Sequence, residues 1–144
     1  MSEFSISSPD FKDGEEIPKK FGYKHENKTP NIQIQNMPPE SISWALIMDD
    51  PDAMKAVGKV WVHWLVCNMS SITGPHYGIH GKTDFGETEY GGPAPPDGRH
   101  TYIFKAFALD TKLDLVKGFS KQELEDAMKG HIIAEATLTG TFAP

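Results

Sequence analysis

The chain has 144 residues, which is the size of a single domain with a substantial hydrophobic core, and we expect residues 1–144 to form one domain. It carries 14 basic and 20 acidic side chains, a formal net charge of −6, and Arg99 is its only arginine. Because no clustered basic stripe is present to neutralise phosphate groups, this charge pattern excludes binding to nucleic acid and to membranes through a polybasic segment.

The cysteine content and the apolar runs bear on where the protein resides. Cys67 is the only cysteine and cannot form an intramolecular disulfide, which fits a reducing compartment. The first 20 residues, MSEFSISSPDFKDGEEIPKK, do not combine a cationic start with an apolar run, as a signal peptide does. No apolar stretch approaches the roughly 20 residues of a membrane-spanning helix. We therefore expect a cytoplasmic protein without a transmembrane segment.

Alternating and branched apolar residues predict five strands in chain order, over residues 31–37, 43–48, 60–69, 100–109 and 134–142. Turn-forming residues separate them, including Pro38-Pro39, Asp50-Pro51 and the long segment 70–98. One helix is predicted after Ser120, which has the spacing of a capping box with Glu123, and Gly130 is a suitable end for it. This pattern predicts a mainly β fold, an antiparallel β-sandwich with one or two peripheral helices.

Residues two apart in a strand share a face, and this periodicity gathers polar side chains at three strand ends. They are His100 and Tyr102 on one strand, His63 and Trp61 on a second, and Asp50 and Asp52 at the end of a third. If these ends meet, two carboxylates, two imidazoles and a phenol form a small pocket. Each residue also has a structural interpretation, since strand histidines are commonly hydrogen-bonded into the fold and Asp-Pro-Asp is commonly a turn. From the residues alone, both interpretations remain open.

Three blocks of sequence resemble the motifs of the phosphatidylethanolamine-binding protein family, and most closely its short bacterial and archaeal branch, often called Raf-kinase-inhibitor-like. The blocks are DDPDA (49–53), VHWLVCNM (62–69) and YGGPAPPDGRHTYIFKAFALD (90–110), and they follow the family's order. The segments FKDGEEIP, GKTDFGETEYGG and EATLTGTFAP fit as well, so the resemblance covers nearly the whole chain.

The resemblance implies a β-sandwich with a surface pocket for a small anion such as phosphate, acetate or a phospholipid headgroup. Matched motif by motif, the ligand-binding residues are Asp50, Asp52, His63, His100 and Tyr102, with Trp61, Pro95 and Pro96 as walls. Short members of the family are often homodimers, so we expect a homodimer. We expect no cofactor and no metal.

Two positions depart from the family pattern. Met54 stands where the family usually has proline, so we expect a trans Ala53–Met54 bond or a rim of different shape. Thr101 stands where arginine is common, which leaves less positive charge near the pocket. An anion would then depend on protonated His63 and His100, with the aspartates orienting the imidazoles and raising their pKa values. Such a site favours monoanions.

Three classes of function are considered. The resemblance to the family implies a ligand-binding module that regulates a kinase or a protease by docking, and this is the function we expect. An alternative is a protein-interaction inhibitor whose pocket is vestigial. A third is a metal-dependent or acid–base enzyme, since two histidines and an aspartate can hold a metal or transfer protons. We expect no enzyme and assign no catalytic residue, because the matching motifs contain no serine or cysteine placed as a nucleophile.

Overall fold

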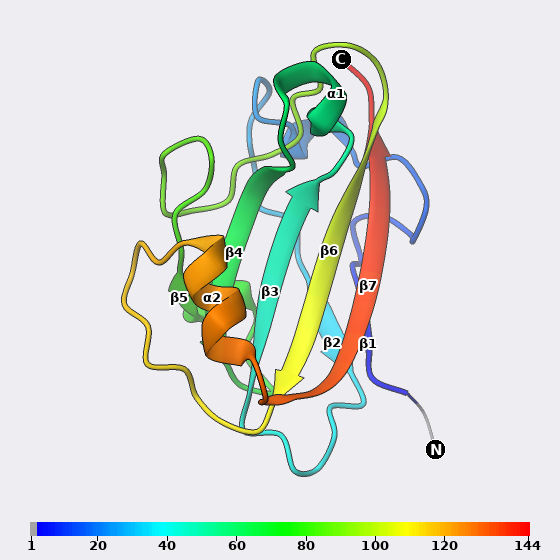
Figure 1. The fold of residues 1–144 in the computed structure, drawn as a ribbon. Coiled ribbons are helices and arrows are strands. Elements are labelled where there is room, and N and C mark those ends of the chain that lie inside the picture. Colours follow the sequence, from blue (N-terminus) through cyan, green and yellow to red (C-terminus); the bar gives the residue numbers. More distant parts are fainter. Residues whose placement is uncertain (1–2) are drawn as a thin grey trace.

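Seven strands form two antiparallel sheets in the computed structural model, which describes residues 3–144 (Figure 1). The large sheet contains β3 (Ser43–Asp50), β4 (Trp61–Met69), β5 (Ile79–His80), β6 (His100–Leu109) and β7 (Ile132–Phe142), in the order β5-β4-β3-β6-β7. The small sheet pairs β1 (Ser5–Ser7) with β2 (Gln33–Gln35). The predicted mainly β fold with antiparallel sheets is therefore confirmed.

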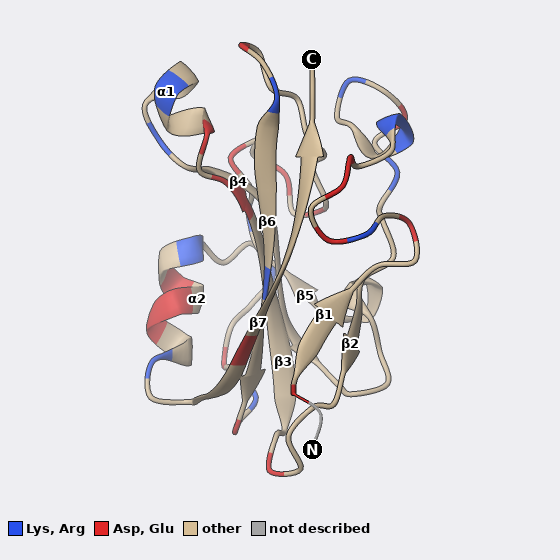
Figure 2. Cartoon of the chain, turned by 90° about the vertical axis from the view of Figure 1, so that its right-hand side faces the viewer, with Lys and Arg blue, Asp and Glu red and all other residues tan. Residues whose placement is uncertain are grey.

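The chain folds into three layers, which Figure 2 shows edge-on. The small sheet lies against one face of the large sheet, and the helix α2 (Lys121–Met128) covers the other face. The alternation of β3 divides its side chains between two cores: Trp44 and Leu46 pack toward the small sheet, and Ala45 and Ile47 pack toward α2. The large sheet is thus buried on both faces along its central strands.

The predicted helix and one unpredicted helix both cap the large sheet. At α2, Ser120 and Glu123 form the expected capping box, and the helix ends at Met128, two residues before Gly130. A short helix that the sequence did not predict, α1 (Ala53–Val57), continues directly from the Asp-Pro-Asp turn. The Ala53–Met54 bond inside it is trans, as expected, and residues 3–144 contain no cis peptide bond.

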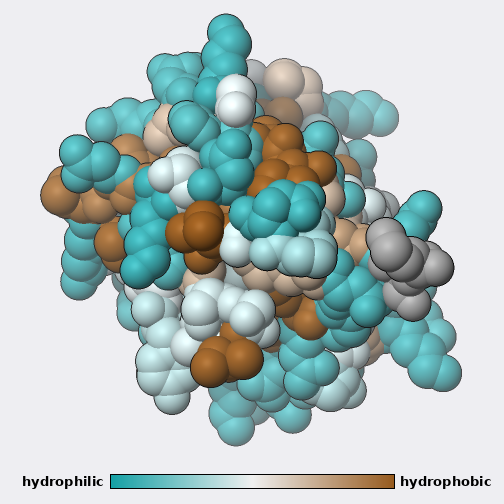
Figure 3. Space-filling view, turned by 90° about the horizontal axis from the view of Figure 1, so that it is seen from below, coloured by the Kyte–Doolittle hydropathy of each residue, from teal (hydrophilic) through white to brown (hydrophobic). Residues whose placement is uncertain are grey.

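The two ends of the large sheet differ. At one end, α1 and the loop of residues 90–99 surround the C-terminal end of β3 and the start of β6 (Figure 1). The opposite end shows small hydrophobic patches divided by hydrophilic side chains rather than one continuous apolar face (Figure 3).

Within residues 3–144, neither helix has the length and apolar character needed to cross a membrane.

Candidate functional site

Antiparallel pairing brings the three predicted motifs to one end of the large sheet. β3 ends at Asp50, opposite Trp61 at the start of β4. β6 begins at His100 on the other side of β3, where Asp49 pairs with Ile103. The periodicity and the strand order together therefore place the aspartates and both histidine motifs side by side, as the sequence predicts.

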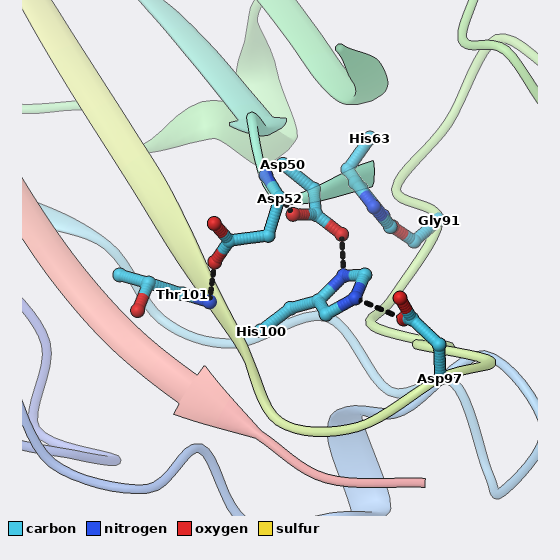
Figure 4. Close-up of polar contacts among 7 residues, drawn as sticks. All are labelled: Asp50, Asp52, His63, Gly91, Asp97, His100 and Thr101. Atoms are coloured by element: carbon cyan, nitrogen blue, oxygen red, sulfur yellow. Dashed lines mark hydrogen bonds and ion pairs between the residues drawn. The ribbon is translucent and has the colours of Figure 1, made fainter. Parts of the chain in front are cut away.

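His100 is held between two carboxylates (Figure 4). Its Nδ1 lies 2.6 Å from Asp50 Oδ2, and its Nε2 lies 2.5 Å from Asp97 Oδ1. Both ring nitrogens can donate hydrogen bonds only when the imidazole carries its second proton. Burial opposes that charge, but the hydrogen bonds to Asp50 and Asp97 outweigh it and raise the pKa of His100 above its ordinary value. These two contacts therefore favour the charged imidazolium form of His100.

The Asp-Pro-Asp segment forms a turn that fixes both of its carboxylates. Asp50 Oδ1 accepts a hydrogen bond from the backbone N–H of Asp52 at 2.9 Å. Asp52 Oδ2 accepts one from the backbone N–H of Thr101 at 2.8 Å and so joins the turn to β6 (Figure 4). The structural interpretation of the motif is correct, and the same turn positions Asp50 against His100.

His63 differs from the expectation that both histidines are protonated. Its Nδ1 donates to the carbonyl oxygen of Gly91 at 2.6 Å, and the ring is buried. Burial lowers the pKa of His63, and the hydrogen bond to Gly91 together with the charge of Asp50 offsets only part of that effect. His63 is neutral at neutral pH, so the positive charge of the two histidines resides on His100.

Tyr102 joins the two imidazoles beneath the surface. Its ring centroid lies 5.1 Å from that of His63, edge to face, and 6.3 Å from that of His100. The side chain is fully buried, and its hydroxyl has no hydrogen-bond partner among residues 3–144. Burial first, and then the neighbouring Asp50 carboxylate, raise the pKa of Tyr102, so the phenol keeps its proton.

A surface hollow of about 550 Å³ opens above His100. Its lining residues are Pro51, Asp52, Met54, Lys55, Asp97, Gly98, Arg99 and His100. Of the residues predicted for the pocket, Asp52 and His100 line this hollow, whereas Asp50, His63 and Tyr102 are buried beneath or beside it.

The predicted walls lie elsewhere. Trp61 packs edge-on against Phe85, with ring centroids 5.6 Å apart. Pro95 is buried and Pro96 is exposed, and neither lines the hollow. The prolines therefore shape the loop that carries Asp97 rather than forming a wall of the hollow.

Among the charged residues of the hollow, sequence reasoning missed Lys55, Asp97 and Arg99. Arg99 supplies part of the positive charge that is missing because Thr101 stands where the family commonly has arginine. The Arg99 guanidinium also forms an ion pair with Glu16, with Nε 3.1 Å from Oε2. Arg99 and Asp97 both stand in the block that carries His100, so proximity in the sequence was the available signal. Lys55 gave no signal, because α1 was not predicted.

Hydrogen bonds and close packing at two glycines, Gly91 and Gly92, hold the loop of residues 90–99 against the rest of the protein. Gly91 and His63 bond reciprocally, since the N–H of Gly91 donates to the backbone oxygen of His63 at 2.9 Å. The N–H of Gly92 donates to Asn27 Oδ1 at 2.8 Å. A Cβ at Gly92 would lie 1.9 Å from the carbonyl oxygen of Phe21, so only glycine fits there.

Comparisons with known proteins cover almost the whole chain. The family model of the phosphatidylethanolamine-binding protein matches residues 7–143. A UPF0098 protein of Methanothermobacter thermautotrophicus is 40% identical, over 92% of this chain and 93% of its own. A UPF0098 protein of Chlamydia trachomatis is 37% identical, over 95% and 97%.

Two solved structures share the fold. A protein of Chlamydia trachomatis described as a phosphatidylethanolamine-binding protein homologue superposes with a TM-score of 0.90 at 35% identity, over 98% of this chain and 97% of that one. Escherichia coli YbcL, described as a member of the mammalian PEBP family, superposes with a TM-score of 0.87 at 27% identity, over 98% of each chain. With the motifs at one end of the sheet and the family model spanning residues 7–143, the chain belongs to the phosphatidylethanolamine-binding protein family.

Proposed function

We propose that this protein is a binding module for small monoanions, such as phosphate, acetate or a phosphorylated headgroup, at the hollow above His100. The observation that carries the proposal is a buried histidine, whose charged form Asp50 and Asp97 favour, at the base of an open hollow whose rim adds Lys55 and Arg99. Protonated imidazole, ammonium and guanidinium groups all donate hydrogen bonds, and none of them accepts one. Lys55 and the remaining N–H groups of Arg99 can donate to an anion, and His100 can do so through Nε2 once Asp97 gives up that position.

The carboxylates of the hollow favour singly charged ligands. Asp52 and Asp97 line the same space, so each added negative charge on a ligand is repelled by two neighbours as well as attracted by three cations. A monoanion gains most of the hydrogen bonds with the least repulsion. A protonated phosphate oxygen can also donate to one of the carboxylates.

Calorimetric titration with inorganic phosphate at pH 5.5 tests the proposal. We expect His100→Gln to weaken phosphate binding about tenfold, which corresponds to about 1.4 kcal/mol, because the buried charge is lost. The matched control is His131→Gln, since His131 is an exposed histidine bonded to Asp110 at 2.8 Å. Equal affinities in the wild type and in both variants would contradict the proposal.

Repeating the titration at different pH values, with phosphate and with acetate, distinguishes the effect of the ligand's charge on affinity from the effect of the charge of His100. Raising the pH from 5.5 to 8 removes the second proton of inorganic phosphate, which makes it largely a dianion and weakens its binding beside Asp52 and Asp97. Acetate remains a monoanion over this range, so its affinity falls less. The raised pKa of His100 keeps the imidazole charged over more of the interval. A phosphate affinity that rises with pH contradicts the assignment.

We further propose that the module docks onto a kinase or a protease and regulates it. Family membership supports this proposal, as do two exposed apolar side chains on α1: Met54, which lines the hollow, and Val57, at the end of the helix. If the hollow is linked to docking, His100→Gln changes the inhibition of the partner enzyme in a rate assay. If inhibition is unchanged, the protein is a protein-interaction inhibitor whose pocket is vestigial.

A further inference from the structure

The two carboxylates that hold His100 are placed very differently. The Asp50 side chain is 4% exposed and is fixed by the Asp-Pro-Asp turn, whereas the Asp97 side chain is 42% exposed at the tip of a loop. Among the described residues, His100 is the only hydrogen-bond partner of the Asp97 carboxylate. Asp50 is therefore a permanent part of the site, and Asp97 is a partner that the site can release.

Asp97 stands where a ligand has to bind. Asp50 occupies Nδ1 of His100, so only the Nε2–H can donate to an anion in the hollow, and Asp97 Oδ1 accepts that hydrogen bond at 2.5 Å. Both Asp97 and His100 line the hollow. An anion oxygen within hydrogen-bond distance of Nε2 would overlap with the Asp97 carboxylate.

We propose that Asp97 is an internal competitor that occupies the anion position of His100 and thereby determines which anions the hollow accepts; this inference rests on the anion-binding function proposed above. An attached competitor acts at an effective concentration in the millimolar range or above. A simple carboxylate ligand that displaces Asp97 accepts the same hydrogen bond from His100 Nε2 that Asp97 accepted, so its binding gains little free energy from the exchange. A tetrahedral oxyanion has further oxygens for Lys55 and Arg99 and gains more.

The backbone at the tip of the loop allows the release of Asp97. Gly98 has a φ of +144°, a region that is essentially restricted to glycine, and a Cβ built there meets no atom within 4 Å. The loop tip is thus surrounded by open space rather than packed side chains. Because the Asp97 side chain is already 42% exposed, its carboxylate can turn from His100 toward solvent.

Calorimetry with inorganic phosphate and with acetate, on the full chain at pH 5.5, tests the inference. At this pH a histidine near its ordinary pKa of about 6.5 keeps its charge even without Asp97. We expect Asp97→Asn to strengthen phosphate binding about tenfold and to strengthen acetate binding at least as much, so that the preference for phosphate does not increase. Asp114→Asn, which removes the same charge at an exposed position outside the hollow, should change either affinity by less than about twofold.

The outcomes separate this inference from the proposed function. If the wild type binds phosphate and neither Asp97→Asn nor Asp97→Ala binds it more tightly, Asp97 does not compete with the ligand, and only the inference is overturned. If neither the wild type nor these variants binds phosphate or acetate at millimolar concentrations, the proposed function is overturned as well. An amide NMR spectrum of each variant establishes that it is folded, and Asp97→Ala serves as the second variant if Asp97→Asn is not.

Discussion

The two histidines of the site show how neighbouring residues of the same type acquire opposite properties. His63 and His100 both contact the ring of Tyr102 and are both buried. His63 is bonded to a neutral carbonyl oxygen, so burial lowers its pKa, whereas His100 is bonded to two carboxylates that raise its pKa against the effect of burial. The deeper burial of His63 and the two carboxylate partners of His100 together decide which histidine favours the charged form.

This difference predicts how His100 contributes to stability at different pH values. Because its folded pKa lies above the unfolded value of about 6.5, its contribution is complete below pH 6.5 and is lost as the pH rises through the folded pKa. We expect His100→Gln to lower the free energy of unfolding by about 3 kcal/mol at pH 6, since it leaves the buried Asp50 carboxylate without its cation. The deficit should shrink toward pH 9, as measured by urea unfolding.

The exposed pair of His131 and Asp110 provides the control for this measurement. Their side chains are 45% and 49% exposed, so His131→Gln should cost less than about 1 kcal/mol. A His100→Gln deficit that is constant or grows between pH 6 and pH 9 is incompatible with a charged His100 in the folded protein.

At the level of elements, the loop of residues 90–99 is held by close backbone contacts rather than by regular secondary structure. The clearest is at Gly92, where the Cβ of any other residue would overlap with the carbonyl oxygen of Phe21. The oxygen of Phe21 belongs to the backbone, and a Cβ is attached directly to the backbone at position 92. The overlap can therefore be relieved only if the loop moves. The loop carries Asp97, so its position determines the geometry of the hollow.

Gly92→Ala is therefore expected to destabilise the protein by about 3 kcal/mol and to weaken phosphate binding. Thermal unfolding and calorimetry measure the two effects. Gly74→Ala is the matched control, because a Cβ at Gly74 has only one neighbour within 4 Å, at 3.7 Å, and its φ lies outside the left-handed region. Equal melting temperatures for the two variants would show that the loop adapts without cost.

The long elements of the fold could be predicted from the sequence, and most of the short ones could not. The strand expected over residues 100–109 matches β6, and Ser120 and Glu123 cap α2 as predicted. The strand expected over 31–37 stops at Gln35, because Asn36 adopts a positive φ of 59° that no strand continues through. β1, β5 and α1 have five residues or fewer, which is too short for a hydrophobic period to be recognised.

The same limit applies to the site. Strand periodicity and the motif resemblance brought Asp50, His63, His100 and Tyr102 to one end of the sheet. Lys55, Asp97 and Arg99 escaped prediction because they belong to a short helix and a loop, whose conformations follow from tertiary contacts rather than from any repeat in the sequence.

At the level of the whole molecule, we predict a homodimer that pairs through the β7 edge of the large sheet. The C-terminal half of β7 is covered by residues 14–17, since Gly14 and Ile17 donate backbone hydrogen bonds to Thr139 and Thr141. In the described part of the chain, no strand lies beyond the N-terminal half of β7, and an edge strand of this kind can pair with a second copy. Light scattering at micromolar concentration should give twice the 16.0 kDa of one chain, and a particle of 16.0 kDa contradicts the prediction.

The central claim is that an anion binds at His100 in the hollow between α1 and the loop of residues 90–99. A crystal structure of the wild-type protein in the presence of phosphate tests it most directly. We predict tetrahedral density with one oxygen about 2.7–3.2 Å from His100 Nε2 and the Asp97 side chain turned toward solvent. The hydrogen bond between Nδ1 and Asp50 should remain. An unchanged contact between His100 and Asp97 at saturating phosphate, with no density in the hollow, would contradict the account.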